Sequence, residues 1–207
     1  MIQQLKPYPA CKDSGVPWLG KVPEHWKIDR LKSVVDQINE QTPIKDGDDV
    51  YVALEHVESW TGRVLSTDNH TTFDSQVKRF RRDDVLFGKL RPYLAKVARL
   101  PRAGVCVGEF LVLRTRVGAS EPAFVENILR SKPVIDVINS STFGAKMPRA
   151  DWSFIGNLAL AFPSLPEQSA IVRLTAPSPT ASTPTSASSP PAWNGLGTYP
   201  SIGRCGG

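Results

Sequence analysis

Cysteine and histidine are scarce in this sequence, and their scarcity argues against two common ways of stabilising a small protein. The three cysteines are odd in number and far apart, which predicts reduced thiols in a cytosolic protein rather than a disulfide framework. The three histidines have no cysteine or carboxylate neighbours at metal-ligand spacing. We therefore expect no structural zinc, no other metal and a cytoplasmic location.

Long apolar runs are also missing. Residues 1–9 are polar and residues 158–162 are far too few to span a bilayer. The N-terminus lacks the basic and apolar regions of a secretory signal, so we expect no membrane partner. The apolar share of 41% and charged share of 22% are typical of a globular protein, and 207 residues fit one domain with an appendage.

Catalytic motifs are the third absence. A methyltransferase acting on an exocyclic amine would need a Pro-Pro-Tyr/Phe motif to hold a flipped base, but Pro190 and Pro191 are followed by Ala192. Neither G-x-x-x-x-G-K-[ST] nor G-x-G-x-x-G occurs. Asp83 and Asp84 are not followed by the acid-x-Lys triplet that a metal-dependent nuclease would use. The sequence indicates a binding protein that is not an enzyme and has no cofactor.

The C-terminal stretch lacks charge. Residues 174–207 contain no Asp, Glu, Lys or His and a single Arg, and they are mostly Pro, Ser, Thr, Ala and Gly. Such a segment cannot bury enough apolar surface to offset its ordering entropy. We therefore predict a disordered tail over residues 175–207.

The rest of the chain predicts a mixed α+β domain. Apolar and β-branched content predicts strands over residues 26–31, 50–57, 84–86, 105–117 and 158–162. Helical spacing predicts a short amphipathic helix over residues 30–38 and longer helices over 122–131 and 134–140, separated by Pro133. A further helix begins at residues 166–168, where Pro and a first-turn acid are favoured. We expect a mixed or antiparallel sheet with flanking helices.

A basic segment, FRRDDVLFGKLRPYLAKV at residues 80–97, is the most informative feature that is present. Nine Lys or Arg and two acids lie between Lys78 and Arg102, a net +7 against +5 for the whole chain. This excess suits a polyanion, because each cation can neutralise one phosphate and release its counterion. On composition alone, a solvated rim around a buried strand explains the charge equally well.

Within this segment Lys89 and Arg91 are two residues apart, so an extended chain places them on one face. Gly88 permits close backbone approach, and Pro92 fixes the chain just before Tyr93. A second basic loop, STFGAKMPRADW at residues 141–152, adds two more cations. The predicted nucleic-acid-binding residues are Arg79, Arg81, Arg82, Lys89, Arg91, Tyr93, Lys146 and Arg149.

Structural roles explain these residues at least as well one by one. Lys146 and Arg149 could hold a turn, and Arg91 could pair with Glu109 inside the fold. The absence of a catalytic set favours the binding interpretation for the segment as a whole.

Five blocks of the sequence resemble the specificity (S) subunits of type I restriction-modification enzymes. In order they are KDSGVPWLGKVPEHWKIDRLK (12–32), YVALEHVESWTGRV (51–64), DVLFGKLRPYLAKV (84–97), GEFLVLR (108–114) and STFGAKMPRADWSFIGNLALAFPSLPEQSAIV (141–172). The resemblance implies a target-recognition domain over residues 1–165, which reads one half of a bipartite sequence in double-stranded DNA. It also implies a non-catalytic subunit that directs a methyltransferase (modification) subunit and a motor-nuclease (restriction) subunit.

Two departures from the family qualify this interpretation. Only one recognition domain is present, and the spacer helix expected after LPEQSAIV extends only over residues 166–174 before the Pro/Ser/Thr tail. A helix of two turns is too short for independent stability. We therefore expect a chain truncated or frameshifted at its C-terminus, with impaired docking to the modification subunit. The alternative is a remnant or interaction protein that folds but does not assemble a restriction complex.

Overall fold

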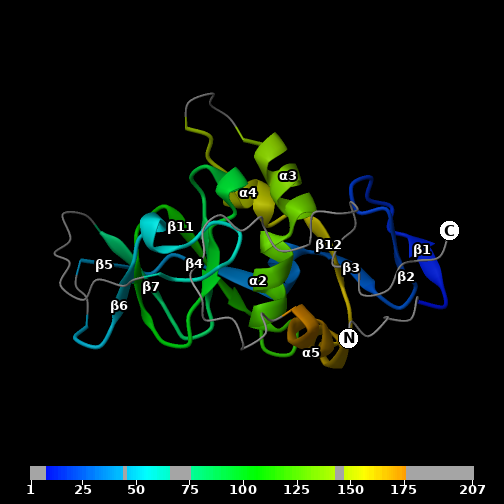
Figure 1. Ribbon diagram of the computed structural model, residues 1–207, viewed down its shortest axis with the longest axis horizontal. Helices are drawn as coiled ribbons and strands as arrows, with labels where there is room; N and C mark the ends of the chain where they lie inside the picture. Colours follow the sequence, from blue (N-terminus) through cyan, green and yellow to red (C-terminus); the bar gives the residue numbers. More distant parts are fainter. Residues whose placement is uncertain (1–7, 44–45, 66–75, 143–146, 176–207) are drawn as a thin grey trace, which may run out of the picture.

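The computed structural model describes residues 8–43, 46–65, 76–142 and 147–175, and short strands and helices alternate along it (Figure 1). The predicted α+β class is confirmed. The predicted disordered tail, apart from Thr175, lies outside the described residues. In chain order the elements are β1 (Cys11–Asp13), β2 (Lys21–Pro23), β3 (Lys27–Arg30), α1 (Leu31–Val34), β4 (Val35–Ile38), β5 (Gln41–Thr42), β6 (Val50–Val52), η1 (Leu54–His56), β7 (Val77–Phe80), β8 (Val85–Gly88), η2 (Pro92–Leu94), β9 (Val97–Arg99), β10 (Gly104–Cys106), β11 (Phe110–Thr115), α2 (Pro122–Arg130), α3 (Lys132–Ser140), α4 (Trp152–Ile155), β12 (Ala159–Phe162) and α5 (Leu165–Thr175).

An antiparallel sheet in the order β4-β11-β8-β9 forms the middle layer. Alternate side chains of its strands enter two different cores. Phe87 and Leu113 pack into the larger core with the helices, whereas Leu86 and Val112 pack into the smaller core with the second sheet. Because both faces are buried, β8 and the first four residues of β11 are continuously apolar instead of alternating.

The second sheet has the order β5-β7-β10-β6, and only its β10–β6 pair is parallel. The single strand predicted over residues 105–117 is wrong, because β10 belongs to this sheet and β11 to the middle one. The chain turns between them at residues 107–110, where the Phe110 N–H donates to the Val107 carbonyl at 3.0 Å. An apolar run buried on both faces carries little sign of such a change of sheet, and the exposed Gly108 is its one local mark.

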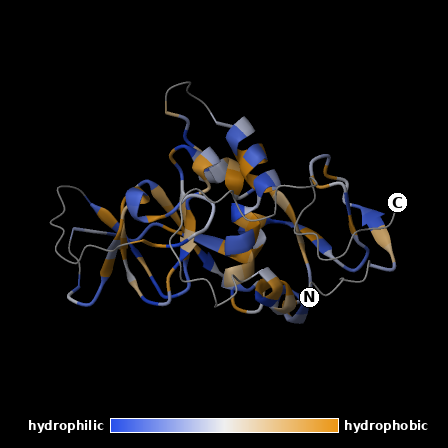
Figure 2. Ribbon diagram, in the orientation of Figure 1, coloured by the Kyte–Doolittle hydropathy of each residue, from blue (hydrophilic) through white to orange (hydrophobic). Residues whose placement is uncertain are grey.

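Helix α2 covers the middle sheet on the side of the larger core, and α3 packs against α2 and η2 (Figure 1). α2 buries Phe124 and Ile128 and α3 buries Val134 and Ile138, each pair four residues apart. Figure 2 shows apolar and polar residues interleaved along both helices, as this one-sided burial requires. Both predicted helices are confirmed, with Pro133 in the first turn of α3, where a missing N–H costs no helical hydrogen bond.

The helix predicted over residues 30–38 is wrong in its second half. Only Leu31–Val34 is helical, and β4 follows at once. Val34 and Val35 are β-branched, and pairing of β4 with β11 satisfies the backbone, so sheet formation overrides the amphipathic pattern. The strand predicted over residues 50–57 likewise ends at Val52, and η1 follows.

The predicted strands near residues 26–31 and 158–162 are confirmed as β3 and β12, which pair with each other in an antiparallel sheet of two strands. β1 and β2 form a separate hairpin (Figure 1). α5 begins at Leu165, close to the predicted start, and packs against α2. In the described ranges no helix combines the length and apolar character that a bilayer crossing requires.

Of the three cysteines, Cys205 lies outside the described residues. Cys106 is free and buried, and burial raises the pKa of its thiol to about 12, which makes it a poor nucleophile.

Candidate nucleic-acid interface

The two basic segments predicted from the sequence lie against each other. The Arg91 N–H donates to the Pro148 carbonyl at 2.9 Å, and the Ala150 N–H donates to the Lys89 carbonyl at 2.9 Å. These backbone bonds join the loop after β8 to the loop before α4. The side chains of Lys89, Arg91, Tyr93 and Arg149 therefore belong to one region of the surface, which we call the basic face.

A tight reversal after β8 exposes Arg91. Its backbone is left-handed, with φ 51° and ψ 62°, an uncommon conformation for a residue other than glycine. Pro92 follows and is buried, and the chain turns through η2 into β9. Arg91 is exposed at the apex of this turn, and 44% of the surface of Tyr93 is exposed to solvent. The turn thus presents a cation and an aromatic ring from one rigid loop.

Lys89 is half-buried and has no ion-pair partner within the described part of the chain. A second lysine lies beneath it. Lys78 is buried and donates from Nζ to the Phe110 carbonyl at 3.0 Å. Burial lowers the pKa of Lys78, and the positive charge of Lys89 lowers it further. Lys89 forms no ion pair in the described residues, but its charge acts on Asp151, whose pKa is lowered first by hydrogen bonds from Ser153 and further by Lys89.

Arg149 is paired within the protein. Its Nη2 donates to Glu109 Oε1 at 2.9 Å, while 60% of the Arg149 side chain remains exposed. Glu109 Oε2 is buried and has no hydrogen-bond partner in the described residues. The pairing proposed between Arg91 and Glu109 is not formed, because Arg149 occupies that position. Glu109 is thus an acid set among the cations of the basic face.

Other cations of the basic segment hold the fold together. Arg79 Nη1 pairs with Asp46 at 2.7 Å and Asp49 at 3.0 Å, and the hydrogen bond to Asp46 raises the pKa of the guanidinium. Lys96 Nζ donates to the backbone carbonyl of Leu54 at 2.7 Å. Much of the local charge that stands out in the sequence is therefore used internally.

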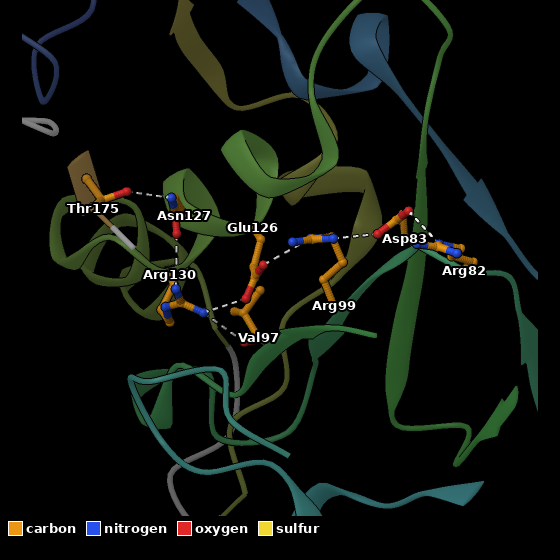
Figure 3. Close-up of polar contacts among 8 residues, drawn as sticks. All are labelled: Arg82, Asp83, Val97, Arg99, Glu126, Asn127, Arg130 and Thr175. Carbon is orange, nitrogen blue, oxygen red and sulfur yellow. Dashed lines mark hydrogen bonds and ion pairs between the residues drawn. The ribbon is translucent and has the colours of Figure 1, made fainter. Parts of the chain in front are cut away.

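Arg81 and Arg82 precede β8 and so lie beyond the opposite end of that strand from Lys89 and Arg91. Arg82 pairs with Asp83 at 3.5 Å, and Asp83 also accepts from Arg99, which reaches Glu126 at 3.3 Å. This network ties the corner of the sheet to the helices (Figure 3). Its members are Arg82, Asp83, Val97, Arg99, Glu126, Asn127, Arg130 and Thr175.

The predicted binding residues therefore separate into three places. Lys89, Arg91, Tyr93 and Arg149 come together on the basic face, Arg81 and Arg82 lie at the opposite end of β8, and Arg79 points into its own ion pairs. Lys146 lies outside the described residues. Within the described ranges, no three His, Cys, Asp or Glu side chains gather as a metal ion would require.

Sequence reasoning missed two features of the basic face. Met147 is 53% exposed beside Pro148 and adds an apolar side chain. The second feature is Glu109, which the sequence predicts only as a partner for Arg91. Its isolation could have indicated a special role, since Glu109 is the only acid between Asp84 and Glu121.

Comparisons with known proteins connect this arrangement to one class. No family model matches the chain. The specificity subunit of the type I restriction enzyme EcoDI from Escherichia coli is 24% identical over 173 residues, which cover 80% of this chain and 38% of that protein. The solved HsdS subunit from Thermoanaerobacter tengcongensis superimposes with a TM-score of 0.62 at 26% identity, over 73% of this chain and 41% of that one. A structure described as the basis of complex assembly and conformational transition of the type I R-M system gives a TM-score of 0.62 at 25% identity, over 73% and 41% of the two chains.

The chain is thus similar in sequence and fold to specificity subunits of type I restriction systems. The resemblance to the specificity subunits of type I restriction-modification systems is confirmed, over one target-recognition domain. The chain spans about two fifths of the length of these relatives.

Proposed function

We propose that this chain is a non-catalytic recognition subunit that binds one half of a bipartite sequence in double-stranded DNA, and that it does so through the basic face. The observation that supports this most strongly is the joining of the two basic segments by backbone hydrogen bonds. They present Lys89 and Arg91 with no carboxylate partner in the described residues. Lys and Arg side chains contact phosphates, and Arg also reads guanine.

The double variant Lys89→Ala/Arg91→Ala tests the proposal. Loss of two phosphate contacts is expected to reduce the slope of log K against log salt by about 1.8. At 0.1 M salt this corresponds to an affinity several tens of fold lower. Fluorescence anisotropy with a labelled random-sequence duplex, titrated from 50 to 200 mM salt, measures both quantities.

Lys12→Ala/Lys21→Ala is the matched control, because it removes two exposed cations from the separate β1–β2 hairpin. It is expected to leave the salt slope unchanged. Equal losses from both double variants would show that binding follows total charge and not the basic face. No salt-dependent binding by the unaltered chain, even at low salt, would overturn the proposal.

We further propose that residues 1–165 form the recognition domain and that α5 opens the spacer helix toward the methyltransferase and motor-nuclease subunits. Support comes from the similarity to one chain of a structure described as the basis of complex assembly of the type I R-M system and from the packing of α5 against α2. Co-expression with a tagged modification subunit tests this, and recovery of this chain in the affinity eluate would show that the short α5 suffices for docking. Its absence there would instead favour a protein that folds without assembling.

A further inference from the structure

Glu109 stands where an acid is least expected. It lies in the turn between β10 and β11, and its backbone carbonyl accepts from the Lys89 N–H at 2.8 Å. Its side chain, 33% exposed, reaches Arg149 through Oε1, while Oε2 is buried with no hydrogen-bond partner in the described chain. A buried carboxylate oxygen left without a donor costs free energy, and the negative charge of Glu109 offsets only part of the burial of Lys78, whose pKa stays lowered.

The contact with Arg149 occupies a cation that would otherwise face the ligand. An ion pair that is largely exposed contributes little to stability, so its loss would leave the fold intact. The same contact can nonetheless hold the guanidinium away from a phosphate. The carboxylate also repels phosphates that approach Lys89 and Arg91. Both effects oppose binding to the backbone of any DNA, whatever its sequence.

We propose that Glu109 is a specificity-determining residue that suppresses non-specific DNA binding by restraining Arg149 and repelling phosphates at the basic face. The inference rests on the proposed function. Discrimination between partners often depends on such a repulsive group, because it penalises every ligand whose other contacts do not compensate for it. Phosphate contacts supply nearly all non-specific affinity, so a carboxylate in their midst acts on that component directly.

Glu109→Gln tests the inference with a random-sequence duplex as the probe. The substitution keeps the size of the side chain, removes the negative charge and weakens the hold on Arg149, because a neutral amide oxygen is a poorer acceptor for a guanidinium than a carboxylate. The salt slope is expected to increase in magnitude by about 0.9, which at 0.1 M salt means binding roughly 8-fold tighter. A purely structural role for Glu109 would lower stability and leave the slope unaltered or reduced.

Asp36→Asn is the matched control. It makes the same change of charge and releases Arg116 from a 2.6 Å ion pair, at the other end of β11 from Glu109. Its salt slope is expected to equal that of the unaltered chain. An equal rise in both variants would overturn the inference, because net charge alone would then explain it.

A double-mutant cycle tests the restraint of Arg149 separately, and the effect of Arg149→Gln in the unaltered chain is measurable even if Glu109→Gln is unstable. Arg149→Gln is expected to weaken binding only slightly in the unaltered chain and by about 8-fold in the Glu109→Gln background. Glu109→Asp retains the charge and is expected to keep the original slope. Equal effects of Arg149→Gln in both backgrounds would overturn the inference while leaving the proposed function standing. Absence of any duplex binding by the unaltered chain would overturn both.

Discussion

Replacing Asp84 by Asn is expected to lower the free energy of unfolding by about 3–5 kcal/mol. The Asp84 side chain is 2% exposed and accepts from Arg114 Nε at 2.8 Å and Nη2 at 2.7 Å, and from the Arg81 N–H at 2.7 Å. The hydrogen bond to Asp84 raises the pKa of the Arg114 guanidinium, which stays charged. Asn would leave that half-buried cation without its counterion. Urea unfolding followed by tryptophan fluorescence measures the loss.

Asp36→Asn again serves as the control, because its partner Arg116 and its own carboxylate are both about half exposed. Solvent screens that pair, so the urea midpoint is expected to stay close to that of the unaltered chain. A midpoint for Asp84→Asn equal to that of Asp36→Asn would contradict a stabilising role for the buried pair.

Glu167→Ala is expected to cost about 2–4 kcal/mol and to loosen α5. The Glu167 carboxylate accepts from the Tyr8 hydroxyl at 2.6 Å and Trp26 Nε1 at 3.0 Å, and it pairs with His25 Nε2 at 2.9 Å. It thereby fastens the first turn of α5 to the N-terminal part of the chain. Amide hydrogen exchange of residues 167–175 should accelerate in the variant.

The neighbouring Gln168 gives α5 a second attachment that Glu167→Ala leaves intact. Its side chain is buried and accepts from Ser120 Oγ and from the Glu121 N–H, each at 2.9 Å. α5 is therefore expected to loosen without separating from α2. Glu24→Ala, an exposed acid with no side-chain partner in the described residues, is the control and should leave the exchange of α5 unchanged.

Acid should reproduce the effect of Glu167→Ala. Burial alone would raise the pKa of Glu167, but hydrogen bonds from Tyr8, His25 and Trp26 outweigh it and hold that pKa below its usual 4.5. Stability from this carboxylate is therefore complete above about pH 4.5 and is lost as the pH falls through the lowered value. Unfolding midpoints measured from pH 6 to pH 3 should fall less steeply for Glu167→Gln than for the unaltered chain.

High pH is expected to destabilise the same cluster by ionising the Tyr8 phenol. Burial, with Glu167 adding to it, raises the pKa of Tyr8 above the usual 10.0. Its contribution to stability is thus complete below pH 10.0 and declines above it.

Much of the fold could be predicted from the sequence because several elements are decided locally. α2 and α3 have apolar residues four apart and a proline in the first turn, and both form where predicted. The predictions failed where long-range pairing decided the outcome. Val35 joins β11 instead of extending a helix, and the apolar run from Val105 divides between two sheets.

The sequence by itself determined the α+β class, the family resemblance and the two basic segments, because these depend on composition, periodicity and the order of motifs. Only the tertiary structure decided which cations remain free to bind. Arg79 is held by two carboxylates and Lys96 by backbone carbonyls, while Lys89 and Arg91 have no carboxylate partner in the described chain. The sequence does not distinguish a paired cation from an unpaired one. An ion pair needs two groups within about 4 Å, and the fold alone sets which groups come that close.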